Sequence, residues 1–186
     1  MLPKRWSCPA NDLELRWPPE FWAADWSKAV GEVIERLKGR PLLQGRAGFC
    51  FAEVQGEECF SKARALLAGR FQGVDIAEIS SGGIWAGRGL GSATWLTAIG
   101  NVFVDKLGGR KAFATLDDDI VVHELGAGLL VQAGEKPSLG DVNAGDTLPL
   151  YRKVAKFLMP TRYHGHIVWT NVMPPDAKAW LARLDP

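Results

Sequence analysis

The strongest constraint on the fold is a pair of β-type runs that lie close together in the second half of the chain. Residues 120–125 and 129–133 are rich in Val, Ile and Leu, and a Gly-Ala-Gly segment links them. Two such runs joined by a short glycine-containing link predict a β-hairpin. Because a hairpin pairs its two strands antiparallel, we expect a mainly antiparallel sheet.

Apolar residues at helical spacing lie on both sides of this hairpin, and no repeat or interdomain linker interrupts the chain. Strands and helices in this mixture predict an α+β fold, a mainly antiparallel sheet flanked by helices. We expect an N-terminal extension over residues 1–11 and a single domain over residues 12–186. The expected helical segments are 19–39, 57–68, 92–107 (with Ser92 as its cap), 110–116, 147–158 and 174–184. The other expected strands are 13–17, 45–54 (a central strand) and 167–170.

Composition excludes several classes of function. The net charge is +1 and is spread along 186 residues, which argues against a basic patch for nucleic acid. The three cysteines, Cys8, Cys50 and Cys59, lack C-x-x-C spacing, which argues against a disulfide framework or a zinc site. No window approaches the roughly 18 apolar residues of a membrane span, and the N-terminus has no secretory apolar region. We therefore expect a cytoplasmic protein in which most of the tryptophans are core residues.

The glycine-rich stretch GGIWAGRGLGSATW, residues 82–95, does not match a nucleotide-binding loop. Its Gly87, Gly89 and Gly91 put the third glycine one place early for the dinucleotide pattern, and no Lys follows as a phosphate loop needs. We expect a structural connection in which the glycines allow positive φ. No nucleotide cofactor is predicted.

The histidines and Cys50 are the candidates for catalysis or metal binding. His164 and His166 form an H-x-H pair, but His123 is the chain's only other histidine, and we expect solvated loop histidines without a metal. Cys50 lies in an apolar run, where a thiolate is disfavoured. We expect no enzyme activity, and a small enzyme that uses Cys50 beside His123 on neighbouring strands is kept as an alternative.

Two acidic segments are candidate binding sites. Asp117, Asp118 and Asp119 precede the hairpin, and we expect a solvated turn that blocks aggregation at a sheet edge. Residues 135–146 (EKPSLGDVNAGD) carry three carboxylates against one Lys. In this loop we expect Asp141 and Asn143 to make local backbone hydrogen bonds and Asp146 or Thr147 to cap the next helix. Its functional interpretation is an acidic surface for a basic partner.

The second half of the chain resembles the type VI immunity family, bacterial antidotes to type VI secretion effectors. The resemblance rests on a W-L-T helix ending in L-G-G (95–109), a strand ending in Q-A-G (132–134), and L-G-D-V-N-x-G before a P-x-Y-R helix (139–152). The earlier GRAGFCFAEV and RFQGVDI are similar to the family's glycine-rich strand and R-F-P-G-x-D-I segment, with Gln72 where Pro is usual. Family members carry a longer region than the residues before Asp12.

The resemblance implies a non-catalytic partner-binding protein that occludes a cognate effector toxin, with no cofactor. A nuclease toxin has a basic cleft, in which carboxylates of the antidote imitate phosphates. The candidate toxin-binding residues are Glu135, Asp141, Asp146, Asp117, Asp118, Asp119, Trp85 and Arg88. The candidate structural residues are Trp95, Gly140, Asn143, Gly145 and Tyr151. A homodimeric scaffold and an orphan antidote remain alternatives, and the sequence leaves the oligomeric state open.

Overall fold

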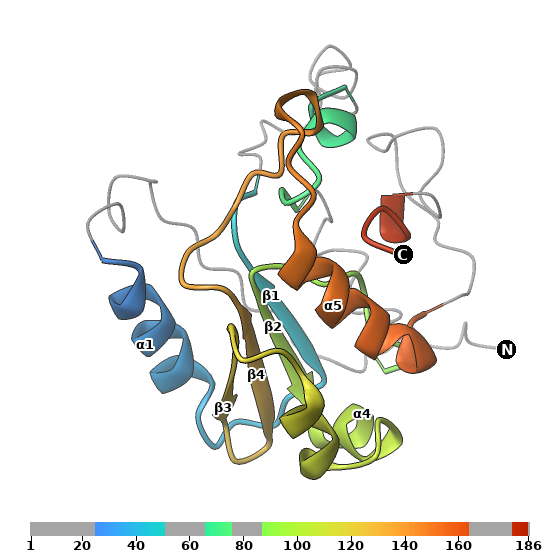
Figure 1. Ribbon diagram of the computed structural model, residues 1–186. Helices are drawn as coiled ribbons and strands as arrows, with labels where there is room; N and C mark the ends of the chain where they lie inside the picture. The colour runs from blue at the N-terminus through green and yellow to red at the C-terminus, as the bar shows by residue number, and fades with distance from the viewer. Residues whose placement is uncertain (1–24, 51–65, 76–86, 164–179, 186) are drawn as a thin grey trace, which may run out of the picture.

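A four-stranded antiparallel sheet lies at the centre of the computed structural model, which describes residues 25–50, 66–75, 87–163 and 180–185 (Figure 1). The strands are β1 (Gln44–Ala47), β2 (Leu96–Gly100), β3 (Ile120–Glu124) and β4 (Gly128–Ala133), in the order β1-β2-β4-β3. Every neighbouring pair is antiparallel. The predicted α+β class with an antiparallel sheet is confirmed.

The predicted hairpin is β3 followed by β4. Ile120 pairs with Ala133 at its open end, and Glu124 pairs with Leu129 near the turn. The turn passes through Gly126 at a φ of 79°, a left-handed conformation that favours glycine.

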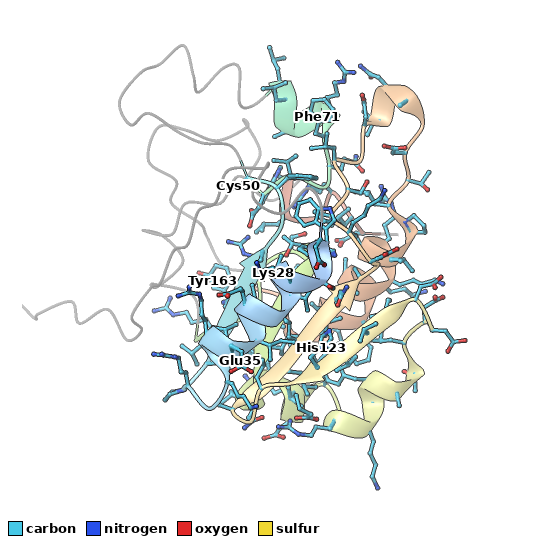
Figure 2. The ribbon with its side chains drawn as sticks, turned by 90° about the vertical axis from the view of Figure 1, so that its left-hand side faces the viewer. Lys28, Glu35, Cys50, Phe71, His123 and Tyr163 are labelled. Atoms are coloured by element: carbon cyan, nitrogen blue, oxygen red, sulfur yellow. The ribbon has the colours of Figure 1, made fainter. Side chains whose placement is uncertain are left out.

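Two amphipathic helices cover opposite faces of the sheet (Figures 1 and 2). Helix α1 (Trp26–Leu37) begins at Asp25, whose carboxylate accepts a hydrogen bond from the Lys28 N–H at 3.2 Å. Helix α5 (Pro149–Leu158) buries the predicted inward residues Tyr151, Val154, Ala155 and Leu158. Apolar residues of both helices pack against the sheet and form one hydrophobic core.

Strand β2 is the most buried element of the sheet. All ten residues from 91 to 100 are buried, and Ile99 is fully inaccessible to solvent. Trp95, just before β2, stacks edge-on against Trp26 of α1 with ring centroids 5.5 Å apart. Its indole N–H donates to the Gly134 carbonyl at 3.0 Å, which ties β2 to the end of β4.

The prediction of one helix over residues 92–107 was wrong. Residues 96–100 form β2, and only α4 (Asn101–Lys106) is helical. A central strand is apolar on both faces and so loses the period-two alternation, which let the spacing of Leu96, Ile99 and Phe103 resemble a helix. Ser92 is buried and caps no helix, since Gly100 precedes α4.

The prediction of a central strand over residues 45–54 was also wrong. β1 covers Gln44–Ala47 and stands at the outer end of the described strand order, because the more apolar β2 takes the central place. Residues 51–54, 13–17 and 167–170 lie outside the described part of the chain.

The remaining helical predictions are confirmed where the structure describes them, except at residues 182–184, which form a turn. α1 and α5 fall within 19–39 and 147–158, and a 3₁₀ helix at Arg110–Thr115 matches 110–116. Residues 66–70 and 180–181 are helical within the expected 57–68 and 174–184 segments, although the first continues two residues further than expected. Two further 3₁₀ turns are Val142–Ala144 and Met159–Thr161. Within the described ranges no helix is long and apolar enough to span a bilayer.

A pair of glycines sets how closely the strands and loops approach. Gly100 pairs with Gly128 across β2 and β4, and a Cβ on Gly100 would overlap the Leu42 carbonyl oxygen. We expect Gly100→Ala to destabilise the protein by about 1–3 kcal/mol, because the backbone around Leu42 must shift. Chemical denaturation measures this difference.

Gly31 provides the matched control, since it lies inside α1 with open space where a Cβ would be. Gly31→Ala should raise stability by about 0.5–1 kcal/mol through helix propensity alone. Equal denaturation midpoints for Gly100→Ala and the unchanged protein would contradict the close approach.

Candidate partner-binding surface

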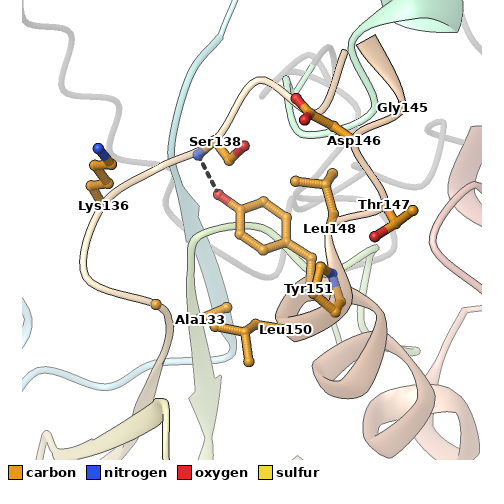
Figure 3. Close-up of a pocket in the computed structure, with 11 residues that line it drawn as sticks. Ala133, Lys136, Ser138, Gly145, Asp146, Thr147, Leu148, Leu150 and Tyr151 are labelled. Carbon is orange, nitrogen blue, oxygen red and sulfur yellow. Dashed lines mark hydrogen bonds between the residues drawn. The ribbon is translucent and has the colours of Figure 1, made fainter. Parts of the chain in front are cut away.

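A surface pocket of about 390 Å³ opens where the end of β4 faces the start of α5 (Figure 3). The loop over residues 134–147 forms one side of it, and the first turn of α5 forms the other. The side chains around it are both polar and apolar, and include Lys136, Asp146, Thr147, Leu148, Leu150 and Tyr151. The lining therefore offers both hydrogen-bonding groups and apolar surface at one place on the protein.

Tyr151 forms a wall of the pocket and holds its loop in place. Its ring is buried, and its hydroxyl oxygen accepts a hydrogen bond from the Ser138 N–H at 3.0 Å (Figure 3). Burial raises the pKa of Tyr151 to about 12, so the phenol is neutral at physiological pH. The α5 sequence places Tyr151 on the same helix face as Val154 and Ala155, which fixes it against the core.

Leu148 stands at the start of α5 in an unusual backbone conformation. It is the only non-glycine residue with positive φ, 50°, among those described, and its side chain is buried. The expectation that Asp146 or Thr147 caps α5 was wrong, because Leu148 occupies the cap position without a side-chain cap bond. Arg152 instead reaches back to the Thr147 carbonyl at 2.7 Å.

Asp141 is the centre of the loop's internal hydrogen bonding. Its carboxylate accepts two bonds from Arg70, at 2.9 and 2.6 Å, and a third from the Asn143 N–H at 3.0 Å. Asp146 accepts a bond from the Asp141 N–H at 3.0 Å. Gly140 and Gly145 have φ values of 64° and 82°, which complete the turns on either side. These contacts commit Asp141 to holding the loop.

Residues 70–73 anchor the same loop through their backbone. The N–H groups of Gln72 and Gly73 donate to the carbonyls of Gly140 and Leu139, at 3.1 and 2.9 Å. The Gln72 side chain accepts a bond from Arg152 at 2.8 Å, which joins the loop, this segment and α5. Proline at position 72 has no N–H, so this chain gains a backbone bond that the resembled motif lacks.

The second acidic segment lies at the same end of the sheet. Asp117 pairs with Lys153 of α5 and accepts a bond from the Asp119 N–H, whereas Asp118 and Asp119 are exposed. They precede Ile120, which pairs with the pocket residue Ala133, and exposed Glu135 follows two residues after Ala133. The fold therefore brings Asp118, Asp119, Glu135 and Asp146 to one end of the sheet.

Other candidate residues lie elsewhere. Exposed Arg88 is near the far end of α5, since Leu90 donates to the Thr161 carbonyl at 2.8 Å, and Trp85 lies outside the described residues. Cys50 follows β1 and His123 is in β3, at opposite ends of the strand order, so the neighbouring-strand pair is not formed. His123 instead contacts Gln132 at 2.9 Å. In the described ranges, no three His, Cys, Asp or Glu side chains gather as a metal site requires.

The sequence patterns did not identify Arg70 and Lys153. Each forms an ion pair with one of the predicted acidic residues, Arg70 with Asp141 and Lys153 with Asp117. Arg70 is 71 residues from Asp141, and Lys153 is 36 residues from Asp117. Single-sequence patterns carry no signal for ion pairs over such separations.

Arg70 controls the ionisation of Asp141. The hydrogen bonds from Arg70 lower the pKa of Asp141 more than any other contact, and Lys153 has the same effect on the pKa of Asp117. We expect Arg70→Gln to raise the pKa of Asp141 and leave that of Asp117 unchanged, with the reverse for Lys153→Gln. Carboxyl chemical shifts followed by NMR against pH measure both groups in each variant.

The pH range over which this contact stabilises the loop follows from the lowered pKa of Asp141. The Arg70–Asp141 contact holds the loop at pH values above the ordinary Asp pKa of about 3.9, and is lost as the pH falls through the lower folded value. A titration in which Arg70→Gln moves neither carboxyl group would show that the pair does not form in solution.

Comparison with known proteins identifies a matching family and a similar solved structure. The model of the TsiV family, described as type VI immunity for VRR-NUC, matches residues 8–184. Among solved structures, the Pseudomonas aeruginosa T6SS protein PA0821 is similar with a TM-score of 0.72 at 22% identity. The match covers 91% of this chain and 51% of PA0821, so this chain spans about half the length of PA0821. At this sequence identity the similarity shows the fold alone. No curated protein matches significantly.

Proposed function

The chain belongs to the TsiV family of type VI immunity proteins for VRR-NUC, and on that premise we propose that it binds a cognate VRR-NUC effector and neutralises it. The family match over residues 8–184 is the observation that carries this proposal. The effector is a nuclease, and the complex forms in the cytoplasm of the protected bacterium. The chain acts as a stoichiometric inhibitor without catalysis of its own.

The surface around the pocket is the proposed contact region. Asp118, Asp119 and Glu135 are exposed carboxylates at one end of the sheet, and Asp146 lines the pocket beside them. A nuclease binds a polyanion, so its cleft presents positive charge. Carboxylates held in place on the inhibitor complement that charge and speed association.

The described contacts divide the acidic residues into two roles. Asp141 and Asp117 are held by Arg70 and Lys153 and shape the loops. Asp118, Asp119 and Glu135 are exposed and form no ion pair with any other described residue. We therefore assign effector contact to the second group and loop support to the first.

The pocket suits a basic side chain from the effector. Leu148 and Leu150 offer apolar surface for the aliphatic stem of Lys or Arg, and Asp146 offers a carboxylate for its charge. Long basic side chains bury their stems and pair their head groups in this manner. An anchor of this kind near the centre of an interface of roughly 1,200–2,000 Å² gives slow dissociation.

Calorimetry with the purified effector tests the proposal. The probe is the VRR-NUC effector of the bacterium that encodes this chain, with its nuclease centre inactivated by substitution. We expect one-to-one binding with nanomolar or tighter affinity. Heat changes indistinguishable from dilution, with both proteins folded, would rule out direct neutralisation of that effector.

Charge reversal tests the contact region. We expect Asp118→Lys, Asp119→Lys and Glu135→Lys together to slow association by about tenfold or more at low salt and to weaken its dependence on ionic strength. Stopped-flow association rates at several salt concentrations provide the measurement.

The matched control reverses exposed acids on other elements. Glu35→Lys lies on α1 and Asp105→Lys lies on α4, both away from the pocket. Together they change the net charge of the protein less than the three reversals do. Their association rates should fall by no more than about threefold. If both sets of variants slow association equally for each charge reversed, the pocket end of the sheet is not the contact region.

A further inference from the structure

The outer edge of β3 has no partner strand among the residues that the structure describes. β3 stands at the end of the strand order and pairs only with β4 among the described strands (Figure 1). In an antiparallel pair, alternate residues exchange both backbone hydrogen bonds with the neighbour, and the residues between them direct their N–H and C=O groups away from it.

The hydrogen bonds at the ends of the ladder fix which β3 residues face outward. Leu125 donates to the Gly128 carbonyl at 3.0 Å, so Leu125 opposite Gly128 is a hydrogen-bonded pair. Hydrogen-bonded pairs alternate along an antiparallel ladder, so the next β3 residues bonded to β4 are His123 and then Val121. The N–H and C=O groups of Val122 and Glu124 consequently point away from β4.

A bond on the opposite edge of β4 agrees with this assignment. Ala133 donates to the Trp95 carbonyl at 2.8 Å, so the odd-numbered residues of β4 serve β2 and the even-numbered ones serve β3. The outward groups of Val122 and Glu124 make no hydrogen bond to any residue in the described ranges. The Ile120 N–H is already used by the Asp117 carbonyl at 2.9 Å.

The side chains along this edge are suited to a basic partner strand. Val121 is 46% exposed and offers an apolar contact in the middle of the strand. Asp118 and Asp119 stand exposed before β3, and Glu124 ends it with 63% of its side chain exposed, beside Arg110 at 3.4 Å. Considering the described residues alone, the edge therefore has unpaired backbone donors and acceptors between acidic ends.

We propose that the open edge of β3 binds an extended, Lys- or Arg-bearing segment of the effector as an added fifth strand. This inference rests on the proposed function and adds a mode of recognition to it. Backbone hydrogen bonds supply affinity in this mode, while side chains at alternate positions supply specificity. The β3 edge begins beside the pocket, so one partner segment reaches both.

A second copy of this chain fits the edge less well. Two β3 strands in antiparallel register place Asp118 and Asp119 of one copy near Glu124 of the other. Like charges opposite one another destabilise a strand pair. Charge complementarity thus favours a basic segment over self-pairing.

Amide hydrogen exchange tests the strand addition directly. In the free chain, the amides of Val122 and Glu124 should exchange faster than those of Val121 and His123, which donate to β4. In the complex with the inactivated VRR-NUC effector, we expect exchange at Val122 and Glu124 to slow by at least tenfold. NMR of the labelled chain resolves these four amides.

A matched pair of variants isolates the backbone bond. Glu124→Pro and Glu124→Ala both remove the carboxylate and its contact with Arg110, but only proline removes the outward N–H. Because that N–H does not donate to β4, proline leaves the hairpin ladder intact. We expect Glu124→Pro to bind the effector about threefold to tenfold more weakly than Glu124→Ala. Circular dichroism and melting confirm that both variants fold.

Each outcome bears on a different claim. Tight effector binding with unprotected Val122 and Glu124 amides, or equal affinities for the two variants, overturns the strand addition and leaves the proposed function standing. Protection that rises with concentration of this chain alone assigns the edge to self-association. Failure of the unchanged protein to bind the effector overturns both proposals.

Discussion

Burial of β2 on both faces is the constraint on which the rest of the structure depends. Its five residues have almost no contact with solvent, so every neighbouring element must supply apolar cover or a backbone partner. β1 and β4 satisfy its hydrogen bonds, and α1 and α5 close over the two faces. Trp95 extends this core to Gly134, where the loop beside the pocket begins. The proposed contact surface therefore adjoins the most buried part of the sheet.

The loop beside the pocket is held by polar side chains that lie outside it in the sequence. Arg70, Arg152 and Tyr151 each bond to it or to the segment that anchors it. A loop fixed in this manner loses little conformational freedom when a partner binds, which favours slow dissociation. The same contacts commit Asp141 to the loop itself, so the proposed recognition is assigned to the exposed acids of this region.

Local signals predicted the hairpin and α5 because each has a short-range cause. Gly126 permits the β3–β4 turn, and the buried residues of α5 recur at helical spacing after Pro149. β2 was misread because double-sided burial erases strand alternation, and β1 was placed too centrally as a result. The acidic candidates were named from composition, but their separation into loop-supporting and exposed groups needed Arg70 and Lys153. The open edge of β3 depends on strand order, which hydropathy does not encode.

The proposed neutralisation of the effector by direct binding of this chain can be measured by titrating nuclease activity. Purified active effector at a fixed concentration well above the dissociation constant receives increasing amounts of this chain, and the rate of DNA cleavage is followed. We expect the cleavage rate to fall linearly to zero at one equivalent of this chain, whereas the cleavage rates of nucleases outside the family should not change. Cleavage that persists at excess inhibitor, or inhibition complete at a small fraction of one equivalent, would contradict stoichiometric neutralisation.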